Sequence, residues 1–416
     1  MRARVATPLA PVNKACTLPS NKKETTMNFD EIIDRRNTHS AKWDAMEPVY
    51  GVPRDEGIAM WVADMDFRPP QSVQDALETM KDQGVYGYYA DEKSYKDSIC
   101  WWMKTRHNWT VDPAAIFTTH GLVNGTSMCV DSFTKPGDGV VLFTPVYHAF
   151  ARVIEASDRQ VVECPLVVED GKYKMDFAAY DAQMTGNETM LVFCSPHNPG
   201  GRVWSREELQ GVIDFAKRHD LILVSDEIHH DLVFPGATHI PMANVDETVA
   251  ERLVMMTATT KTFNIAGSHS GNVIIHDLDL RARFQKRMNA MGISANSFGI
   301  YMAEAAYSEA GAAWLDALVA YLNENRRILD EGLNAIPGVK SMHMEATYLS
   351  WADFSGTGMS SDEFIKRVQE DAKIAANHGI TFGKGGEQYL RFNFATPRAN
   401  IVEAVKRLQK AFEDLQ

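Results

Sequence analysis

Short apolar runs alternate with amphipathic stretches along most of the chain. Five runs of three to five residues are rich in Val, Ile, Leu or Met and are bounded by polar or turn residues, as is typical of buried strands. These runs lie at 140–144, 190–194, 221–225, 254–257 and 273–275. Residues 206–219 carry apolar side chains at helical spacing between two of the runs. Because continuously apolar strands alternate with helices, the pattern predicts a mainly parallel α/β sheet.

The C-terminal part of the chain has a different pattern. A long helical stretch runs from about 303 to 335, strand-like pieces follow near 348–354 and 389–394, and a helical pattern closes the chain at 401–415. We therefore predict a large domain at 71–300 and a smaller α+β domain at 301–416. An N-terminal arm at 27–70 is expected to contribute to the small domain.

The first 26 residues contain basic, proline and polar residues but no apolar core of the roughly 7–15 residues found in a signal peptide. A second methionine, Met27, opens a segment with the pattern of folded protein. We expect residues 1–26 to be a disordered extension or the product of an upstream start. A transit peptide is the weaker alternative.

The composition changes this picture little. Of 416 residues, 45% are hydrophobic and 23% are charged, so the chain can bury a core in each of two domains. The formal net charge of −13 opposes binding to nucleic acid or to anionic membranes. No apolar run reaches the roughly 20 residues of a membrane span. We expect no nucleic-acid partner and no membrane contact.

The cysteines indicate a reducing compartment. They stand at positions 16, 100, 129, 164 and 194, and no two form a C-x-x-C pair. Scattered single cysteines do not indicate a disulfide framework or a zinc module. We therefore predict reduced thiols in a cytoplasmic protein, and no metal site.

Polar residues gather where the predicted strands end, which is where functional residues of parallel α/β folds lie. Asn198 follows one strand, Asp226 the next and Lys261 a third, while Gly121 precedes a small-residue stretch that could start a helix. Each residue alone has an ordinary explanation: a strand-end aspartate is usually a cap or an ion-pair partner, and a lone lysine is usually a solvated surface charge. The signal lies in their order and spacing together.

These motifs resemble those of the fold-type I pyridoxal-phosphate (PLP) enzymes, the class I/II aminotransferase superfamily, and within it the MalY/PatB branch of cystathionine β-lyases and related C–S lyases. The resemblance runs from about residue 27 to the C-terminus. It implies the PLP-dependent transferase-like fold, a homodimer and a small amino-acid substrate. The matching segments are 60–67 (MWVADMDF), 121–124 (GLVN), 145–148 (PVYH), 196–199 (PHNP), 225–229 (SDEIH), 261–267 (KTFNIAG) and 391–398 (RFNFATPR).

The resemblance assigns the central chemistry to two residues. Lys261 would form the Schiff base with PLP, and its amine, once freed by the substrate, would remove the proton from Cα. Such a lysine needs a partly desolvated pocket that lowers its pKa. Asp226 would pair with the pyridine nitrogen and keep the ring protonated, so that the ring accepts the electrons left at Cα.

Other residues would hold the cofactor. The resemblance implies that Asn198 and His229 hydrogen-bond the ring hydroxyl oxygen and that Tyr147 stacks on the ring. The turn at Leu122 and Val123 would offer backbone N–H groups and a helix N-terminus to the phosphate. The structural alternatives are a core histidine at His229 and a core aromatic at Tyr147.

Hydroxyl groups are expected to assist at the phosphate. The resemblance offers Thr257 and Thr259 in the loop before the lysine as candidates, and Tyr88 from the neighbouring subunit as another. Tyr86 and Tyr89 stay open as alternatives to Tyr88. Arg391 would clamp the substrate α-carboxylate in a bidentate pair. Its structural alternative is a surface arginine at a strand end.

Two positions depart from the pattern of many aminotransferases. Ala258 stands where a Ser or Thr is common three residues before the lysine, and His269 stands where an arginine meets the phosphate eight residues after it. Phosphate binding would then rely more on backbone groups and tyrosines. The lyase branch tolerates both changes, so they favour a lyase.

Three functions are compatible with these residues. The leading hypothesis is β-elimination from a cysteine S-conjugate such as cystathionine, with release of a thiol, pyruvate and ammonia. The alternative enzyme is an amino-acid aminotransferase, because both reactions begin with removal of the Cα proton. A non-catalytic regulator on this fold is the third; the intact Lys261, Asp226 and Arg391 argue against it, and 26 residues before Met27 are too few for a helix-turn-helix segment.

Overall fold

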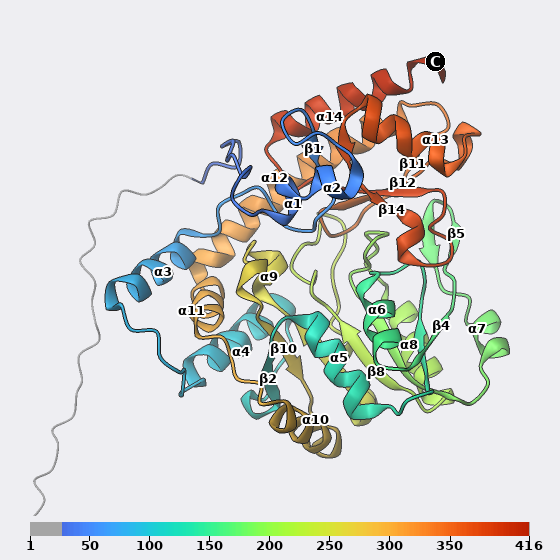
Figure 1. Ribbon diagram of the computed structural model, residues 1–416. Coiled ribbons are helices and arrows are strands. Elements are labelled where there is room, and N and C mark those ends of the chain that lie inside the picture. Colours follow the sequence, from blue (N-terminus) through green and yellow to red (C-terminus); the bar gives the residue numbers. More distant parts are fainter. Residues whose placement is uncertain (1–26, 416) are drawn as a thin grey trace, which may run out of the picture.

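The computed structural model describes residues 27–415 (Figure 1). The expectation for residues 1–26 lies outside this described part of the chain. A large sheet with helices on both faces forms one part of the molecule, and a smaller sheet covered by the C-terminal helices forms the other (Figure 1). Within residues 27–415, no helix combines the length and the apolar character needed to cross a bilayer.

The large sheet has seven strands in the order β2-β10-β9-β8-β7-β3-β4. Strand β10 is antiparallel to both of its neighbours, and the other pairs are parallel, so the predicted mainly parallel sheet is confirmed. Each predicted run falls on a strand. The strands are β2 (Ile116–Thr119), β3 (Gly139–Leu142), β4 (Gln160–Glu163), β7 (Glu188–Cys194), β8 (Ile222–Asp226), β9 (Leu253–Thr257) and β10 (Gly271–Ile274).

Alternate strand residues enter two different cores, which is why these strands are apolar throughout. Val140 and Leu142 of β3 pack in a cluster with α5, α6 and α10, whereas Val141 packs in the cluster that contains α4 and α8. The helices of this part are α3 (Gln71–Gln83), α4 (Lys93–His107), α5 (Leu122–Phe133), α6 (Ala149–Ala156), α7 (Phe177–Gln183), α8 (Arg206–Arg218), α9 (Thr259–Thr262) and α10 (Leu278–Met291). A two-stranded ribbon, β5 (Val167–Glu169) with β6 (Lys172–Lys174), stands apart from the sheet.

Local sequence explains where the helices begin. The hydroxyl of Ser205 accepts from the backbone N–H of Glu208, whose carboxylate accepts from the backbone N–H of Ser205, so a capping box starts α8. Helix α5 starts directly after Gly121, whose φ of +84° suits glycine. That turn places the N-terminus of α5 at the carboxyl end of β2.

The single long helix expected at 303–335 is divided in the structure. Helix α11 (Ser297–Ala306) ends before α12 (Glu309–Asn334) begins. The side chain of Ser308 caps α12 by accepting from the backbone N–H of Gly311. A Cβ at Gly311 would lie 1.8 Å from the carbonyl oxygen of Ala306, so only glycine permits this close turn. The periodic pattern continued across the break and concealed it.

The smaller sheet is antiparallel, in the order β11-β12-β15-β14. Its strands match the pieces expected near 348–354 and 389–394. They are β11 (Lys340–Ser341), β12 (Leu349–Asp353), β14 (Asn377–His378) and β15 (Tyr389–Asn393). Helices α12, α13 (Ser361–Lys366) and α14 (Arg398–Ala411) accompany this sheet (Figure 1).

The N-terminal arm pairs with the C-terminal part. Its helices are α1 (Ala41–Asp44) and α2 (Met46–Tyr50), and its strand β1 (Ile58–Ala59) runs parallel to β13 (Ile374–Ala375). The backbone N–H of Asn393 donates to the carbonyl of Met60 at 2.7 Å. The buried ammonium of Lys42 lies 2.8 Å from a carboxylate oxygen of Asp66 and fixes the arm internally. The proposed domain boundaries at 70/71 and 300/301 stay a prediction.

Candidate functional site

A cavity of about 570 Å³ opens at the carboxyl ends of β2, β7 and β8. Strand β2 supplies the turn before α5, β7 leads to Asn198, β8 ends at Asp226, and β9 leads to α9 and Lys261. These strands point the same way, so their ends meet at one edge of the sheet. The residues predicted from the sequence that line the cavity are Leu122, Val123, Tyr147, Asn198, Asp226, His229 and Lys261.

The arm closes the cavity over Lys261. The Lys261 ammonium nitrogen donates to the carbonyl of Ala63 at 2.6 Å, and the hydroxyl of Tyr348 donates to the same oxygen at 3.0 Å. The side chain of Asn264 holds this part of the arm, because its amide oxygen accepts from the backbone N–H of Met65 at 2.8 Å. The lysine is therefore enclosed by a segment almost 200 residues away along the chain.

Burial shifts the protonation of both central groups. It lowers the pKa of Lys261 from 10.5 to about 8, although the charges of Asp64 and Asp226 oppose this shift. Burial raises the pKa of Asp226 from 3.8 to about 7, while the backbone N–H of Ile228, which donates to Asp226 at 3.1 Å, acts in the opposite direction. Both groups can therefore change protonation near neutral pH, as groups at functional sites commonly do.

Arg391 lies on β15 beside the cavity and is held by neutral groups. Its guanidinium donates to the side-chain oxygens of Asn198 at 2.9 Å and Asn377 at 2.6 Å, and to the carbonyl of Trp61 at 3.0 Å. The group stacks over the ring of Phe382, 4.9 Å from its centroid. Burial lowers the pKa of Arg391 from 12.5 to about 10, and no residue in the described part of the chain forms a hydrogen bond with its buried Nε. The guanidinium retains capacity for an anion.

His229 lines the cavity and has one buried ring nitrogen that no described residue pairs with. The residue is 2% exposed and lines the cavity, and its Nδ1 has no hydrogen-bond partner among residues 27–415. Burial lowers the pKa of His229, so the ring is neutral. Buried polar atoms normally have a partner, so this orphaned nitrogen indicates that a bound group completes the site.

The start of α5 lies at the cavity and is suited to an anion. Gly121, Leu122 and Val123 line the cavity, and the first backbone N–H groups of an α-helix have no partner within the helix. With the helix dipole they favour a phosphate. His269 also lines the cavity, so the residue that replaces the usual arginine lies at the site.

Two of the predicted phosphate residues lie elsewhere in the single chain. Thr259 is buried at the start of α9 and does not line the cavity, whereas its neighbour Thr260 does. The local sequence could not distinguish them, because the direction of each hydroxyl depends on the short helix α9 that contains both. Tyr88 is 102% exposed and also lies outside the cavity lining. Its contribution from a second subunit stays a prediction.

Sequence reasoning missed several residues at the site. Arg152 and Ser127 line the cavity from α6 and α5, and Asn377 holds Arg391. Arg152 stands five residues after Tyr147, a spacing that could have indicated it. Asn377 faces Arg391 only through the register of β14 and β15, for which the sequence carries no signal.

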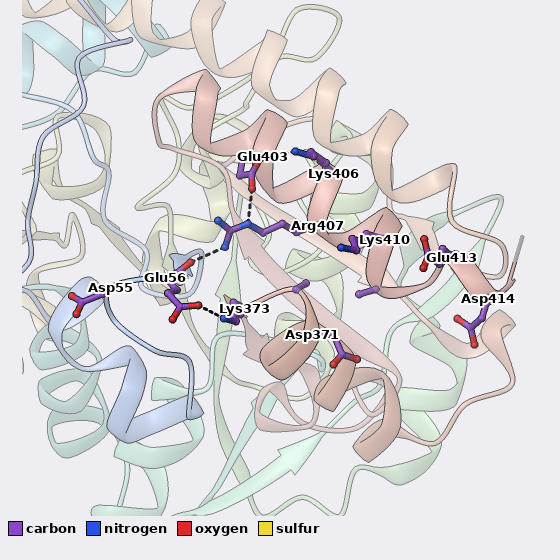
Figure 2. Close-up of a pocket in the computed structure, with 12 residues that line it drawn as sticks. Asp55, Glu56, Asp371, Lys373, Glu403, Lys406, Arg407, Lys410, Glu413 and Asp414 are labelled. Carbon is purple, nitrogen blue, oxygen red and sulfur yellow. Dashed lines mark hydrogen bonds and ion pairs between the residues drawn. The ribbon is translucent and has the colours of Figure 1, made fainter.

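A second cavity, of about 700 Å³, lies between the arm and α14 (Figure 2). Its lining is charged, and the charges pair at the surface. Arg407 donates to the Glu403 carboxylate at 2.8 Å and to the backbone oxygen of Glu56 at 2.7 Å, and Lys373 pairs with the Glu56 carboxylate (Figure 2). None of the functional residues predicted from the sequence lines it. We call this cavity the charged groove.

A comparison with known protein families matches the part of the chain that forms the cavity. The sequence pattern described as "Aminotransferase class I and II" matches residues 58–408, which include the residues that line the cofactor-sized cavity. The chain belongs to the class I and II aminotransferase family. Its mainly parallel sheet and smaller antiparallel sheet are the fold-type I arrangement of PLP-dependent members of this family.

Relatives within the family carry lyase names. The chain is 38% identical to cystathionine beta-lyase PatB of Bacillus subtilis over 92% of this chain and 100% of that protein. The structure of cystalysin from Treponema denticola, which contains PLP, superposes with a TM-score of 0.89 at 38% identity and covers 94% of this chain and 100% of that chain. The PLP-bound C–S lyase of Staphylococcus hominis superposes with a TM-score of 0.86 at 30% identity, covering 94% and 99%.

PLP is the cofactor of this family member, and the cavity fits it. The residues present supply each feature that the molecule requires: a lysine amine, a carboxylate, an unpaired imidazole nitrogen and a helix N-terminus. All four line one cavity of about 570 Å³. The fit rests above all on the orphaned Nδ1 of His229, which has no function in the protein alone.

Proposed function

We propose that the protein is a PLP-dependent carbon–sulfur β-lyase that converts cysteine S-conjugates of the cystathionine type into a thiol, pyruvate and ammonia. The observation that carries this proposal is the meeting of Lys261, Asp226 and His229 in one buried cavity of a chain whose relatives are cystathionine β-lyases and C–S lyases. The same relatives favour a lyase over an aminotransferase.

The lining residues predicted from the sequence would hold the cofactor. When bound, PLP supplies an electron sink for the pair of electrons left when Cα loses its proton. Asp226 would contact the ring nitrogen, and Asn198 and His229 would contact the ring hydroxyl oxygen. Tyr147 would cover one face of the ring, and the backbone at Leu122 and Val123 would receive the phosphate.

Lys261 would move the proton. Because burial lowers its pKa to about 8, the amine loses its proton far more readily than an exposed lysine and can take the proton from Cα in its neutral form. Loss of this proton allows the Cβ–S bond to break with departure of the thiol, and water converts the remaining three-carbon fragment to pyruvate and ammonia. The carbonyl of Ala63 and the hydroxyl of Tyr348 would keep the amine directed into the cavity between steps.

Arg391 would orient the substrate. Its guanidinium is positioned by Asn198, Asn377 and the carbonyl of Trp61, all neutral acceptors, so its charge remains available to the α-carboxylate. A carboxylate fixed in this way would limit the positions that Cα can take in the cavity. Correct placement of reacting groups lowers the barrier by avoiding the entropy cost of finding that geometry during reaction.

A substrate assay separates the two enzymes. Purified protein with PLP should release pyruvate and a thiol from cystathionine without any keto acid. Activity that depends strictly on a keto-acid acceptor, with no pyruvate in its absence, would instead establish an aminotransferase. The absorbance of the lysine-bound cofactor, present in the wild type and lost in Lys261→Ala, reports whether the site is assembled in either case.

We also propose that the enzyme is a cytoplasmic homodimer. Exposed side chains gather near the expected dimer contact: the exposed rings of Tyr86 and Phe298 lie together, and the exposed ring of Tyr301 packs against the half-buried Tyr89. Free thiols at the four described cysteines favour a reducing compartment. Light scattering should give the mass of two chains, and Tyr88→Phe should weaken retention of PLP if this residue reaches the partner's phosphate.

A further inference from the structure

A histidine cluster lies outside the cofactor cavity. His107 ends α4, and His230 and Asp231 follow β8 in the chain. The nitrogen and carboxylate atoms that these three residues offer lie within 4.8 Å of one another. They line a separate cavity of about 320 Å³, which also contains His239. The three side chains are at most 8% exposed, yet the cavity gives them access to solvent.

The hydrogen bonds of His230 leave one nitrogen without a proton. Its Nδ1 lies 2.6 Å from the backbone carbonyl of Glu227. A carbonyl oxygen only accepts, so Nδ1 carries the hydrogen, and in the neutral ring Nε2 presents a lone pair. That Nε2 is buried, has no hydrogen-bond partner within the described residues 27–415 and lies 3.2 Å from a carboxylate oxygen of Asp231.

The lone pair of His230 Nε2 faces a carboxylate oxygen of Asp231, and a cation between or beside these two atoms would relieve their repulsion. The carboxylate of Asp231 already accepts from the indole N–H of Trp102 at 2.9 Å and from the hydroxyl of Thr262 at 2.8 Å, so these two bonds fix its orientation. The Nε2 of His107 lies 2.7 Å from the other side of the same carboxylate. Two imidazoles therefore flank one carboxylate whose orientation is fixed by Trp102 and Thr262. Metal ligands in proteins are commonly oriented by such hydrogen bonds from neighbouring groups.

We propose that His107, His230 and Asp231 bind a divalent transition-metal ion, with Zn²⁺ as the representative ion. Two imidazole nitrogens and one carboxylate suit Zn²⁺ and similar ions, whereas Mg²⁺ and Ca²⁺ prefer oxygen ligands alone. Three protein ligands leave the fourth tetrahedral position to water on the cavity side. His239 is held by the Glu227 carboxylate at 2.8 Å and stays in the second layer.

Metal binding requires one rearrangement. His107 must present the lone pair of Nε2, so its proton moves to Nδ1 and the hydrogen bond to Asp231 is replaced by the metal. His230 needs no change, because its Nδ1 already carries the hydrogen. We expected no metal from the sequence, which carries no signal for this site because His107 and Asp231 are 124 positions apart.

The test is Zn²⁺ binding to the PLP-loaded enzyme after chelator treatment and dialysis, measured by calorimetry. We expect one site per chain that His230→Gln and His107→Gln weaken at least about tenfold. His219→Gln is the matched control, because His219 also lies 2.7 Å from an aspartate, Asp181, but belongs to no three-ligand group in the described chain. Its Zn²⁺ affinity should equal that of the wild type.

Thermal unfolding provides a second measurement. Zn²⁺ should raise the Tm of the wild type and of His219→Gln, and should leave the Tm of His230→Gln unchanged. Retained cofactor absorbance in each variant shows that the chain has folded. The proposal is overturned if the wild type binds no Zn²⁺, or if both site variants bind it as tightly as the wild type. These outcomes do not depend on the lyase activity.

Discussion

The cofactor cavity and the charged groove have similar volumes, about 570 and 700 Å³, but they hold their charges differently. In the groove, Lys373, Glu56 and Arg407 pair with opposite charges near solvent. In the cofactor cavity, burial moves the pKa of Lys261 to about 8 and that of Asp226 to about 7.

This contrast separates a catalytic cavity from a hollow in the surface. Exposed ion pairs are screened by water and each contributes typically below about 1 kcal/mol, so substituting them changes little. Desolvated groups are poised to exchange protons or to bind an added charge. Volume alone does not tell the two cavities apart. Matched substitutions in the two cavities test the distinction.

The largest difference is expected between two lysines. Lys261→Ala should reduce pyruvate release by about 10³-fold or more, because it removes both the attachment point of the cofactor and the proton acceptor. Lys406→Ala, in the charged groove, should leave the rate unchanged. Coupled detection of pyruvate measures both. Comparable rates for Lys261→Ala and the wild type would end the proposed role of Lys261.

A smaller loss is expected at the carboxylate. Asp226→Asn should lower kcat on the order of 10²-fold, because the amide removes the charge that stabilises a protonated ring nitrogen. Asp371→Asn in the groove is the control and should retain wild-type kcat. The cofactor absorbance should persist in Asp226→Asn at saturating PLP. A variant with full kcat would show that the ring nitrogen does not depend on this residue.

Stability of the cofactor-free protein should reveal the cost of burying Lys261. A pKa lowered from 10.5 to about 8 corresponds to roughly 3 kcal/mol. Lys261→Met should therefore raise the free energy of unfolding by up to about that amount at pH 7, whereas Lys406→Met should not. Urea unfolding of both variants without PLP measures this.

The difference in unfolding free energy between Lys261→Met and the wild type should depend on pH. Below pH 8 the lysine is protonated in both states, so its burial destabilises the wild type fully. Between pH 8 and 10.5 the unfolded chain keeps the proton that the folded chain releases, and wild-type stability gains with pH. The advantage of Lys261→Met should shrink over this range. An advantage that does not change with pH would contradict the buried, charged lysine.

The smallest expected effect concerns the arginines. Arg391→Lys should lower kcat/KM about tenfold, mainly through KM, because lysine keeps the charge but loses the bidentate geometry. Arg407→Lys, whose guanidinium contacts Glu403 and the backbone of Glu56, should leave kcat/KM unchanged. Steady-state kinetics with cystathionine distinguish them. Equal effects at the two positions would remove Arg391 from substrate binding.

The sequence predicted most of the large sheet and the central residues of the cavity, because both depend on short-range information. Apolar runs marked five of the seven strands of the large sheet, and the segments after the strands marked Asn198, Asp226 and Lys261. One prediction was wrong where the determinant was not local: the helix expected at 303–335 breaks before α12, because Gly311 lies against the carbonyl of Ala306. The sequence also left open the antiparallel direction of β10, which depends on strands distant in the chain.

By itself, the sequence determined the alternation of strands and helices and the set of chemical groups available, since periodicity and residue type are properties of the chain. The tertiary structure decided which groups lose water and which atoms meet. It placed Ala63 against Lys261, Asn377 against Arg391, and His107 against Asp231. Desolvation and facing lone pairs arise only when segments far apart in the chain pack together, and they govern both the proposed lyase chemistry and the proposed metal site.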